Sequence, residues 1–163
     1  MTTLLQLDVH RHLTELGVEH REMACAAELA DTAAFCAHYG VDPADSANTI
    51  LVASKRPPGE FVLCVVLATT RLDANRAVRD AMGWKKLSFA PAETTLEVTG
   101  MEIGGVTPFG LDHPIPTLID AAVMSRSEVV LGGGNRTSKI RMAPDGLLKL
   151  PTARVIEDLA APA

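Results

Sequence analysis

The sequence lacks a long hydrophobic run and a secretory signal. Its longest apolar segments, such as residues 61–68, are far shorter than the ~20 residues that a membrane-spanning helix needs. Residues 1–17 show no basic start followed by a continuous apolar stretch and a small-residue cleavage site, as a secretory signal would. We therefore expect a cytoplasmic protein that does not associate with membranes.

Cysteine is also scarce. The three cysteines, Cys25, Cys36 and Cys64, are widely spaced, and no two of them form a Cys-x-x-Cys pair. An odd number of separated cysteines is typical of reduced thiols rather than of a disulfide framework. Because Cys36 and Cys64 lie in apolar segments, we expect both thiols to be buried.

The composition predicts one globular domain spanning residues 1–163. The chain is 47% hydrophobic with a mean hydropathy of +0.17, which excludes a disordered protein. A chain of this length buries roughly two thirds of its unfolded surface, enough for a core. The net charge of −5 and the lack of a recognisable DNA-reading helix argue against a specific DNA partner and against a DNA-associated structural protein.

Hydrophobic periodicity, together with glycine and proline positions, predicts interleaved helices and strands. Leucines at helical spacing followed by Gly17 predict the first helix, and Asp73 is the predicted N-cap of a later one. The predicted helices span residues 3–16, 28–39, 73–82, 91–99 and 144–150, and the predicted strands span residues 18–23, 48–53, 60–68, 86–89, 115–119, 128–131, 139–142 and 154–156. Because some strands are joined by turns and others by helices, we expect an α+β fold with a mixed sheet.

Motifs for metal binding and covalent catalysis are absent. The five histidines, at positions 10, 12, 20, 38 and 113, show neither HxxxH nor HExxH spacing. There is no GxSxG elbow, and no cysteine lies in a glycine-rich turn. We therefore expect neither a metal site nor a covalent nucleophile.

The glycine-rich segment GGGNRTSK, residues 132–139, has two interpretations. It departs from both the GxxxxGK[ST] and the GxGxxG patterns. Successive glycines could still direct backbone N–H groups toward an anion, with Arg136 and Lys139 adding charge. The alternative is a glycine hairpin with solvated basic side chains, which the segment favours when it is considered alone.

A second glycine-rich segment, GGVTPFGL, spans residues 104–111 and is equally ambiguous. Pro108 restricts Thr107 to extended conformations, whereas the three glycines permit backbone angles closed to other residues. Such a loop could direct several amides at one oxygen, as an oxyanion site does, or could be a sharp surface turn. Considered alone, this segment favours the turn.

Taken together and in order, these segments resemble the YbaK family, which is related to the editing domain inserted in bacterial prolyl-tRNA synthetases. The resemblance covers roughly residues 28–159. It rests on the segments DTAAFCAHYGV (31–41), NTILVASK (48–55), RLDANRAVRDAMGWKKLSFA (71–90), TGMEIGGVTPFG (99–110) and GGGNRTSKIRM (132–142). The resemblance implies a single compact α+β domain with a mixed, strongly curved β-sheet surrounded by helices.

The function implied by this resemblance is that of an aminoacyl-tRNA deacylase acting in trans. Family members hydrolyse the ester between a small amino acid and the terminal adenosine of a wrongly charged tRNA, with no metal or organic cofactor. Such a second check is needed because one methylene gives a synthetase only ~1–3 kcal/mol of discrimination. The implied partner is the acceptor end of aminoacyl-tRNA. An aminoacyl-tRNA synthetase is a second implied partner.

The resemblance also implies site residues. The family's GxxxP element maps onto Gly104, Gly105, Val106, Thr107 and Pro108, whose backbone would orient the ester carbonyl and the hydrolytic water. A ribose hydroxyl assists in the family pattern, so no acid–base side chain is required. The implied substrate-binding residues are Thr32, Asn48, Thr49, Lys55, Ser88, Phe89, Ala90, Gly133, Gly134, Asn135, Arg136 and Lys139.

Asn48 departs from the family pattern. Active relatives commonly carry a lysine at this position, where it holds the phosphate of the terminal nucleotide. Asparagine supplies no charge, and charged hydrogen bonds are about twice as strong as neutral ones. Either Lys55 or Arg136 substitutes from another position, or the substrate differs, or the activity is weak. The alternative function is a binding module that recognises aminoacyl-adenosine, an amino acid or a protein partner without hydrolysis.

Overall fold

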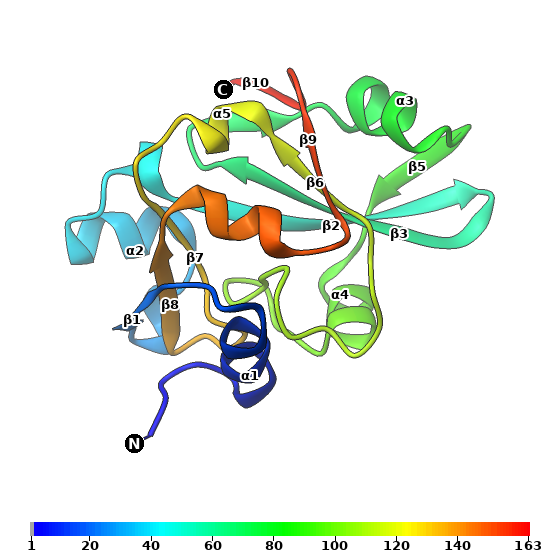
Figure 1. Cartoon of the computed structure of the whole chain (residues 1–163). Coiled ribbons are helices and arrows are strands. Elements are labelled where there is room, and N and C mark those ends of the chain that lie inside the picture. Colours follow the sequence, from blue (N-terminus) through cyan, green and yellow to red (C-terminus); the bar gives the residue numbers. More distant parts are fainter. Residues whose placement is uncertain (1) are drawn as a thin grey trace.

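A five-stranded mixed sheet lies at the centre of the computed structural model, which describes residues 2–163 (Figure 1). Its strands are ordered β5 (Lys86–Phe89), β2 (Ala47–Arg56), β3 (Pro58–Leu67), β6 (Thr117–Asp120) and β9 (Ala153–Ile156). β2 pairs antiparallel with β3 and β5, whereas β6 pairs parallel with β3 and β9. The predicted α+β fold with mixed strand orientation is confirmed, while the strong curvature stays a prediction.

Two smaller sheets accompany the central one. β1 (Arg21–Ala24), β8 (Ser138–Met142) and β7 (Val129–Gly132) form an antiparallel sheet in that order, and β10 (Ala160–Pro162) pairs with β4 (Thr70–Leu72). The helices are α1 (Leu7–Leu16), α2 (Thr32–Tyr39), α3 (Arg79–Met82), α4 (Ala92–Thr99) and α5 (Ala121–Met124). Figure 1 shows α1 beside the β1–β8 pair and α3 near the opposite edge of the molecule.

β3 separates two hydrophobic clusters. Leu63 and Val65 pack in the larger cluster with residues of α1, β7 and β8, whereas Cys64 and Val66 pack in a smaller cluster with Trp84. Successive side chains of a strand point to opposite faces, so β3 contributes to both clusters. Its continuous apolar sequence is that of a strand buried on both faces.

Several element boundaries differ from the prediction. The first helix begins at Leu7 rather than at residue 3, because Gln6 is its N-cap and accepts a hydrogen bond from the Val9 N–H. The predicted helix at 28–39 is divided into a 3₁₀ turn at Ala27–Leu29 and α2, and residues 144–149 form 3₁₀ rather than α-helical turns. The predicted cap at Asp73 is confirmed, since its carboxylate accepts from the Arg76 N–H at 3.2 Å.

The short elements β4, β10 and α5 were not predicted. Each contains three or four residues, too few to display a hydrophobic period. Trp84 and Phe35 are buried, whereas Phe89 is 54% exposed at the end of the edge strand β5. Among residues 2–163, no helix combines the length and the apolar character that crossing a bilayer requires.

The three thiols provide a test of the core. Cys25, Cys36 and Cys64 are buried, and burial raises the pKa of each, for Cys64 to about 12. Because the thiolate is the reactive form, we expect the native protein at neutral pH to react with a disulfide reagent such as DTNB far more slowly than the unfolded protein. Absorbance of the released thiol, with and without guanidinium, measures this difference. Equal rates in the two states would contradict the packing described.

Candidate functional site

A cavity of about 290 Å³ lies between β2, the start of α2, β7 and the loop at residues 103–106. This volume is at the lower end of the ~300–1,000 Å³ that is usual for ligand pockets, so the cavity has room for a small group only. The cavity is lined by Asp31, Thr32, Ser46, Ala47, Asn48, Thr49, Ile50, Leu51, Ala90, Thr95, Ile103, Gly104, Val106, Val130, Leu131, Gly132 and Lys139.

The two glycine-rich segments meet beside this cavity. The N–H of Gly134 donates to the Gly105 carbonyl oxygen at 2.7 Å. A Cβ atom on Gly105 would lie 2.4 Å from the Asn135 carbonyl oxygen, and one on Gly132 would lie 2.6 Å from the Val106 oxygen. Direct backbone contact at both positions therefore requires glycine.

Arg136 holds the loop at 103–106 from the side of α2. Its guanidinium donates to the carbonyl oxygens of Ile103 at 2.6 Å and Ala27 at 2.8 Å, and to the Asp31 carboxylate at 3.2 Å. The planar guanidinium group of an arginine has five N–H donors, so it can bind three acceptors that lie in different directions. Because the Asp31 side chain is largely exposed, its ion pair adds little, and the two carbonyl contacts are the ones that position the loop.

Lys139 holds the same loop from inside the protein. Its side chain is buried, and Nζ donates to the Gly104 oxygen at 2.7 Å and to the Ala30 oxygen at 2.8 Å, above the ring of Phe35. Burial lowers the pKa of the Lys139 ammonium from its usual value. An ammonium group has three N–H donors, so one remains for a ligand in the cavity that Lys139 lines.

These contacts orient two backbone amides of the loop. In a planar trans peptide the C=O and N–H groups point in opposite directions. Since Arg136 binds the Ile103 oxygen and Gly134 binds the Gly105 oxygen, the N–H groups of Gly104 and Val106 point away from those partners. Within residues 2–163 neither N–H has an acceptor, and both residues line the cavity.

Polar side chains on β2 form another part of the wall. Oδ1 of Asn48 accepts a hydrogen bond from Thr32 Oγ1 at 2.5 Å, which leaves the amide N–H groups of Asn48 without an acceptor in the described part of the chain. Thr49 Oγ1 is buried and likewise has no partner there. The Asn48 amide can therefore bind a polar group of a ligand.

The structure brings only part of the predicted site together at the cavity. The residues that line it are Thr32, Asn48, Thr49, Ala90, Gly104, Val106 and Lys139. The contact between the two glycine-rich segments is formed or supported by five other predicted residues, Gly105, Gly133, Gly134, Asn135 and Arg136. Thr107 and Pro108 are buried behind the loop, with the Thr107 hydroxyl unpartnered.

Three predicted residues do not line the cavity. Lys55 lies exposed near the turn of the β2–β3 hairpin, where it pairs with Pro58. Ser88 and Phe89 lie on β5 opposite Ala53 and Val52, and only the following Ala90 lines the wall. The cation at the cavity is therefore Lys139 rather than Lys55.

The Gly133 and Gly134 amides of the GGGNRTSK segment bind carbonyl oxygens of the chain rather than facing an anion. Gly133 donates to the Ser138 oxygen at 3.2 Å, and Gly134 donates to Gly105. This pattern favours the hairpin interpretation of the segment. Sequence reasoning also missed Asp31, Ile103 and Val130, because no pattern distinguishes a residue at a cavity wall from its neighbours in an apolar element.

A small cavity with two unpaired amides, one spare ammonium donor and an apolar wall defines a site for a small group that carries a carbonyl or carboxylate. Residues 26–150 match the family model described as the aminoacyl-tRNA editing domain, so the chain belongs to that family. The predicted resemblance is thereby confirmed.

Several known proteins are similar to this chain. It is 34% identical to the uncharacterized protein YwhH of Bacillus subtilis over 106 residues, which are 65% of this chain and 67% of YwhH. Identity to the "Putative Cys-tRNA(Pro)/Cys-tRNA(Cys) deacylase EbsC" of Enterococcus faecalis is 26% over 108 residues, 66% of this chain and 63% of that protein. The proline–tRNA ligase of Bacillus licheniformis is 31% identical over 101 residues, 62% of this chain but only 17% of the ligase.

Solved structures share the fold over nearly the whole chain. The hypothetical protein APE2540 has a TM-score of 0.84 at 25% identity, covering 94% of this chain and 99% of that one. A protein described as a "putative trans-editing enzyme for prolyl tRNA synthetase" has a TM-score of 0.80 at 24% identity, covering 93% and 94%. At 24% identity, the similarity to the second of these structures supports the fold alone.

The contact between the two loops can be tested with Gly105→Ala. The added Cβ would collide with the Asn135 backbone, so we expect a loss of about 1–3 kcal/mol in the free energy of unfolding. Hydrogen exchange of the Gly134 amide should also accelerate relative to global unfolding. Gly83→Ala is the control, since its Cβ meets nothing within 4 Å and only the positive φ is strained. Unchanged protection of Gly134 in Gly105→Ala would contradict the contact.

Proposed function

We propose that this protein is a trans-acting aminoacyl-tRNA deacylase that hydrolyses the ester of a small, wrongly attached amino acid. Membership of the editing-domain family supports this function. The observation that carries it is the pair of unpaired N–H groups of Gly104 and Val106 at the cavity wall. Ester hydrolysis places negative charge on the carbonyl oxygen, and fixed amide donors stabilise that charge.

In the proposed reaction, a water oxygen bonds to the ester carbonyl carbon and the bond to the ribose oxygen breaks. The ribose oxygen takes up a proton, and the free amino acid leaves. Asp31, the carboxylate that lines the cavity, is paired with Arg136. We assign the activation of water to the neighbouring ribose hydroxyl, as the family pattern implies, and the stabilisation of the oxyanion to the loop.

The cavity walls suit a small aminoacyl group. Ile50, Leu51, Val130 and Leu131 supply apolar surface, and the volume of about 290 Å³ restricts the size of the side chain. On the polar side, we assign to the free N–H groups of Asn48 the binding of an oxygen of the aminoacyl-adenosine. The proposed partner is the acceptor end of aminoacyl-tRNA, and the likeness to a segment of a proline–tRNA ligase supports a relation to that synthetase.

Lys139 supplies the positive charge that Asn48 lacks. The two cations that the sequence offered as substitutes, Lys55 and Arg136, do not line the cavity. Lys139 lines the cavity and keeps one N–H donor for a ligand oxygen. In this proposal Lys139 both positions the Gly104 carbonyl and contributes positive potential to the bound substrate.

Deacylation of mischarged tRNA tests the proposal directly. The protein is incubated with tRNAs carrying radiolabelled alanine, serine, threonine or proline, and release of the amino acid is followed over time. We expect release faster than in buffer for at least one of these tRNAs, because the cavity admits small aminoacyl groups. Heat-unfolded protein is the control. Release at the buffer rate for all four would contradict the proposed activity.

The second candidate function is a binding module without hydrolysis, which the neutral Asn48 favours. If this second function is correct, calorimetry detects binding of a non-hydrolysable aminoacyl-adenosine analogue. The same protein then releases no amino acid from any charged tRNA. Binding together with turnover supports the deacylase instead. The two experiments thus separate the two functions.

Arg136→Lys tests the proposed positioning of the Gly104 amide. A lysine cannot bind the Ile103 and Ala27 carbonyls together in the geometry of the arginine fork, so the Gly104 N–H should lose its fixed direction. We expect kcat for deacylation to fall about tenfold or more with a smaller change in KM, less than the ~10²–10³ that follows complete loss of an oxyanion donor. Steady-state kinetics over a range of substrate concentrations measures kcat and KM.

Arg141→Lys is the matched control for this variant. Arg141 lies on β8 and pairs with Glu128 at 3.1 Å, outside the lining of the cavity. Its replacement keeps the charge and should leave both kinetic constants unchanged. An Arg136→Lys protein with wild-type kcat would remove Arg136 from the positioning of the loop.

A further inference from the structure

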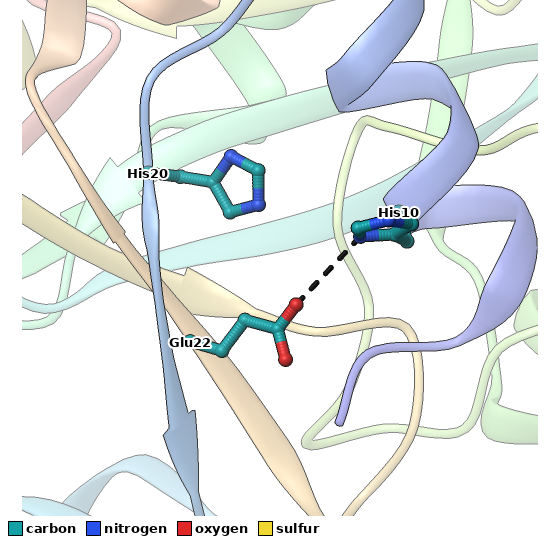
Figure 2. Close-up of side chains that lie close together, drawn as sticks. All are labelled: His10, His20 and Glu22. Carbon is teal, nitrogen blue, oxygen red and sulfur yellow. Dashed lines mark ion pairs between the residues drawn. The ribbon is translucent and has the colours of Figure 1, made fainter. Parts of the chain in front are cut away.

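Three potential metal ligands converge where α1 meets β1 (Figure 2). His10 lies on α1, Glu22 lies on β1, and His20 directly precedes that strand. One ligand atom from each residue lies within 4.8 Å of the other two. All three residues precede the segment that matches the editing-domain family, and none lines the cavity. The cluster is therefore separate from the proposed deacylase site.

His20 presents a lone pair to this cluster. Its Nδ1 lies 2.9 Å from the Val18 carbonyl oxygen, and because a carbonyl only accepts, Nδ1 carries the proton. In the neutral ring the lone pair then lies on Nε2, which Figure 2 shows on the side of the ring that faces His10. A metal-binding histidine is commonly fixed in this way, with its second ring nitrogen bonded to a backbone carbonyl.

Glu22 is held in place by two hydrogen bonds. Oε2 accepts from Thr3 Oγ1 at 2.5 Å, and Oε1 accepts from the Leu4 N–H at 2.6 Å. A carboxylate has about four lone-pair sites, so two remain for another ligand. The supporting bonds are the kind that orient a carboxylate toward a metal ion.

His10 completes the cluster without a hydrogen bond. Its Nδ1 lies 3.7 Å from Glu22 Oε2, beyond hydrogen-bonding distance, and this buried nitrogen has no partner within residues 2–163. Two imidazole nitrogens and a carboxylate oxygen thus lie within 4.8 Å of one another. Electron-pair donors that converge in this way attract a cation.

We propose that His10, His20 and Glu22 bind a divalent transition-metal ion, with zinc as the ion that two imidazoles and one carboxylate suit. Ligand atoms around a tetrahedral zinc ion are about 3.3 Å apart, given bond lengths of about 2.0–2.1 Å. The three side chains therefore need to close by at most about 1.5 Å from their present separation. The His10 side chain is 44% exposed and has room for this movement, and water takes the fourth position.

The bound ion would join α1 to β1 and so stabilise the N-terminal segment. This segment contacts the glycine-rich turn, since the Gln6 N–H donates to the Gly133 oxygen at 3.0 Å and Asn135 Nδ2 donates to the Leu4 oxygen at 3.2 Å. The same turn contacts the loop at 103–106 through Gly134 and Gly105. In this proposal the ion supports the cavity from outside, through the N-terminal segment and the glycine-rich turn.

Zinc binding by the full-length protein, free of any histidine tag, tests this proposal. After treatment with a chelator, the protein is titrated with zinc chloride in a calorimeter, and zinc content is measured by mass spectrometry after gel filtration. We expect one zinc ion per chain and a rise in the melting temperature that EDTA reverses. These readouts do not depend on deacylation, so their failure would leave the proposed function untouched.

Substitutions of single residues test which side chains bind the zinc ion. His10→Ala and His20→Ala should each weaken zinc binding by at least about tenfold. His38→Ala, which removes an exposed histidine from α2, should leave the affinity unchanged and controls for histidine content. Glu22→Gln, close in shape to the native side chain, provides a third ligand variant should either alanine variant fail to fold. No zinc uptake by the wild-type protein, or equal uptake by all variants, would overturn the proposal.

Discussion

The hydrogen bond from the Gly134 N–H to the Gly105 oxygen is the contact on which the cavity depends. It forms only because neither Gly105 nor Gly132 has a Cβ atom, so the two backbones approach within direct contact. With the Gly105 carbonyl turned toward Gly134, the planar peptide turns the Val106 N–H the opposite way. Two motifs far apart in sequence thus produce one of the two donors of the proposed oxyanion site.

Arg136 and Lys139 complete this arrangement by binding backbone carbonyls of the loop. A buried ammonium is costly unless it is hydrogen-bonded, and the Gly104 and Ala30 oxygens together with the Phe35 ring offset that cost. Since carbonyls are neutral, they leave the positive charge of Lys139 largely uncompensated. The same contacts fix the loop and hold the Lys139 ammonium group at the cavity, in a chain whose net charge is −5.

The sequence was most informative where local rules determine the structure. The apolar runs of β2 and β3 and the cap at Asp73 follow from neighbouring residues, and the ordered motifs indicated the family. The partners of individual hydrogen bonds could not be predicted from the sequence. For this reason the sequence allowed an anion to bind the Gly133 and Gly134 amides, whereas in the structure these amides bind carbonyl oxygens of the chain. The His10, His20 and Glu22 cluster escaped the spacing rules because one ligand lies on a helix and two lie at a strand.

Asn48 and Lys139 are best understood as a pair. They line the same cavity of about 290 Å³, Asn48 from β2 and Lys139 from β8. A lysine at position 48 would place a second ammonium group in this small volume, and like charges in a poorly solvated site destabilise each other. A neutral amide at position 48, anchored by Thr32, avoids that repulsion and still offers two N–H donors. In the proposed deacylase, the charge that the family pattern places on β2 is therefore supplied from β8, while β2 supplies directional hydrogen bonds.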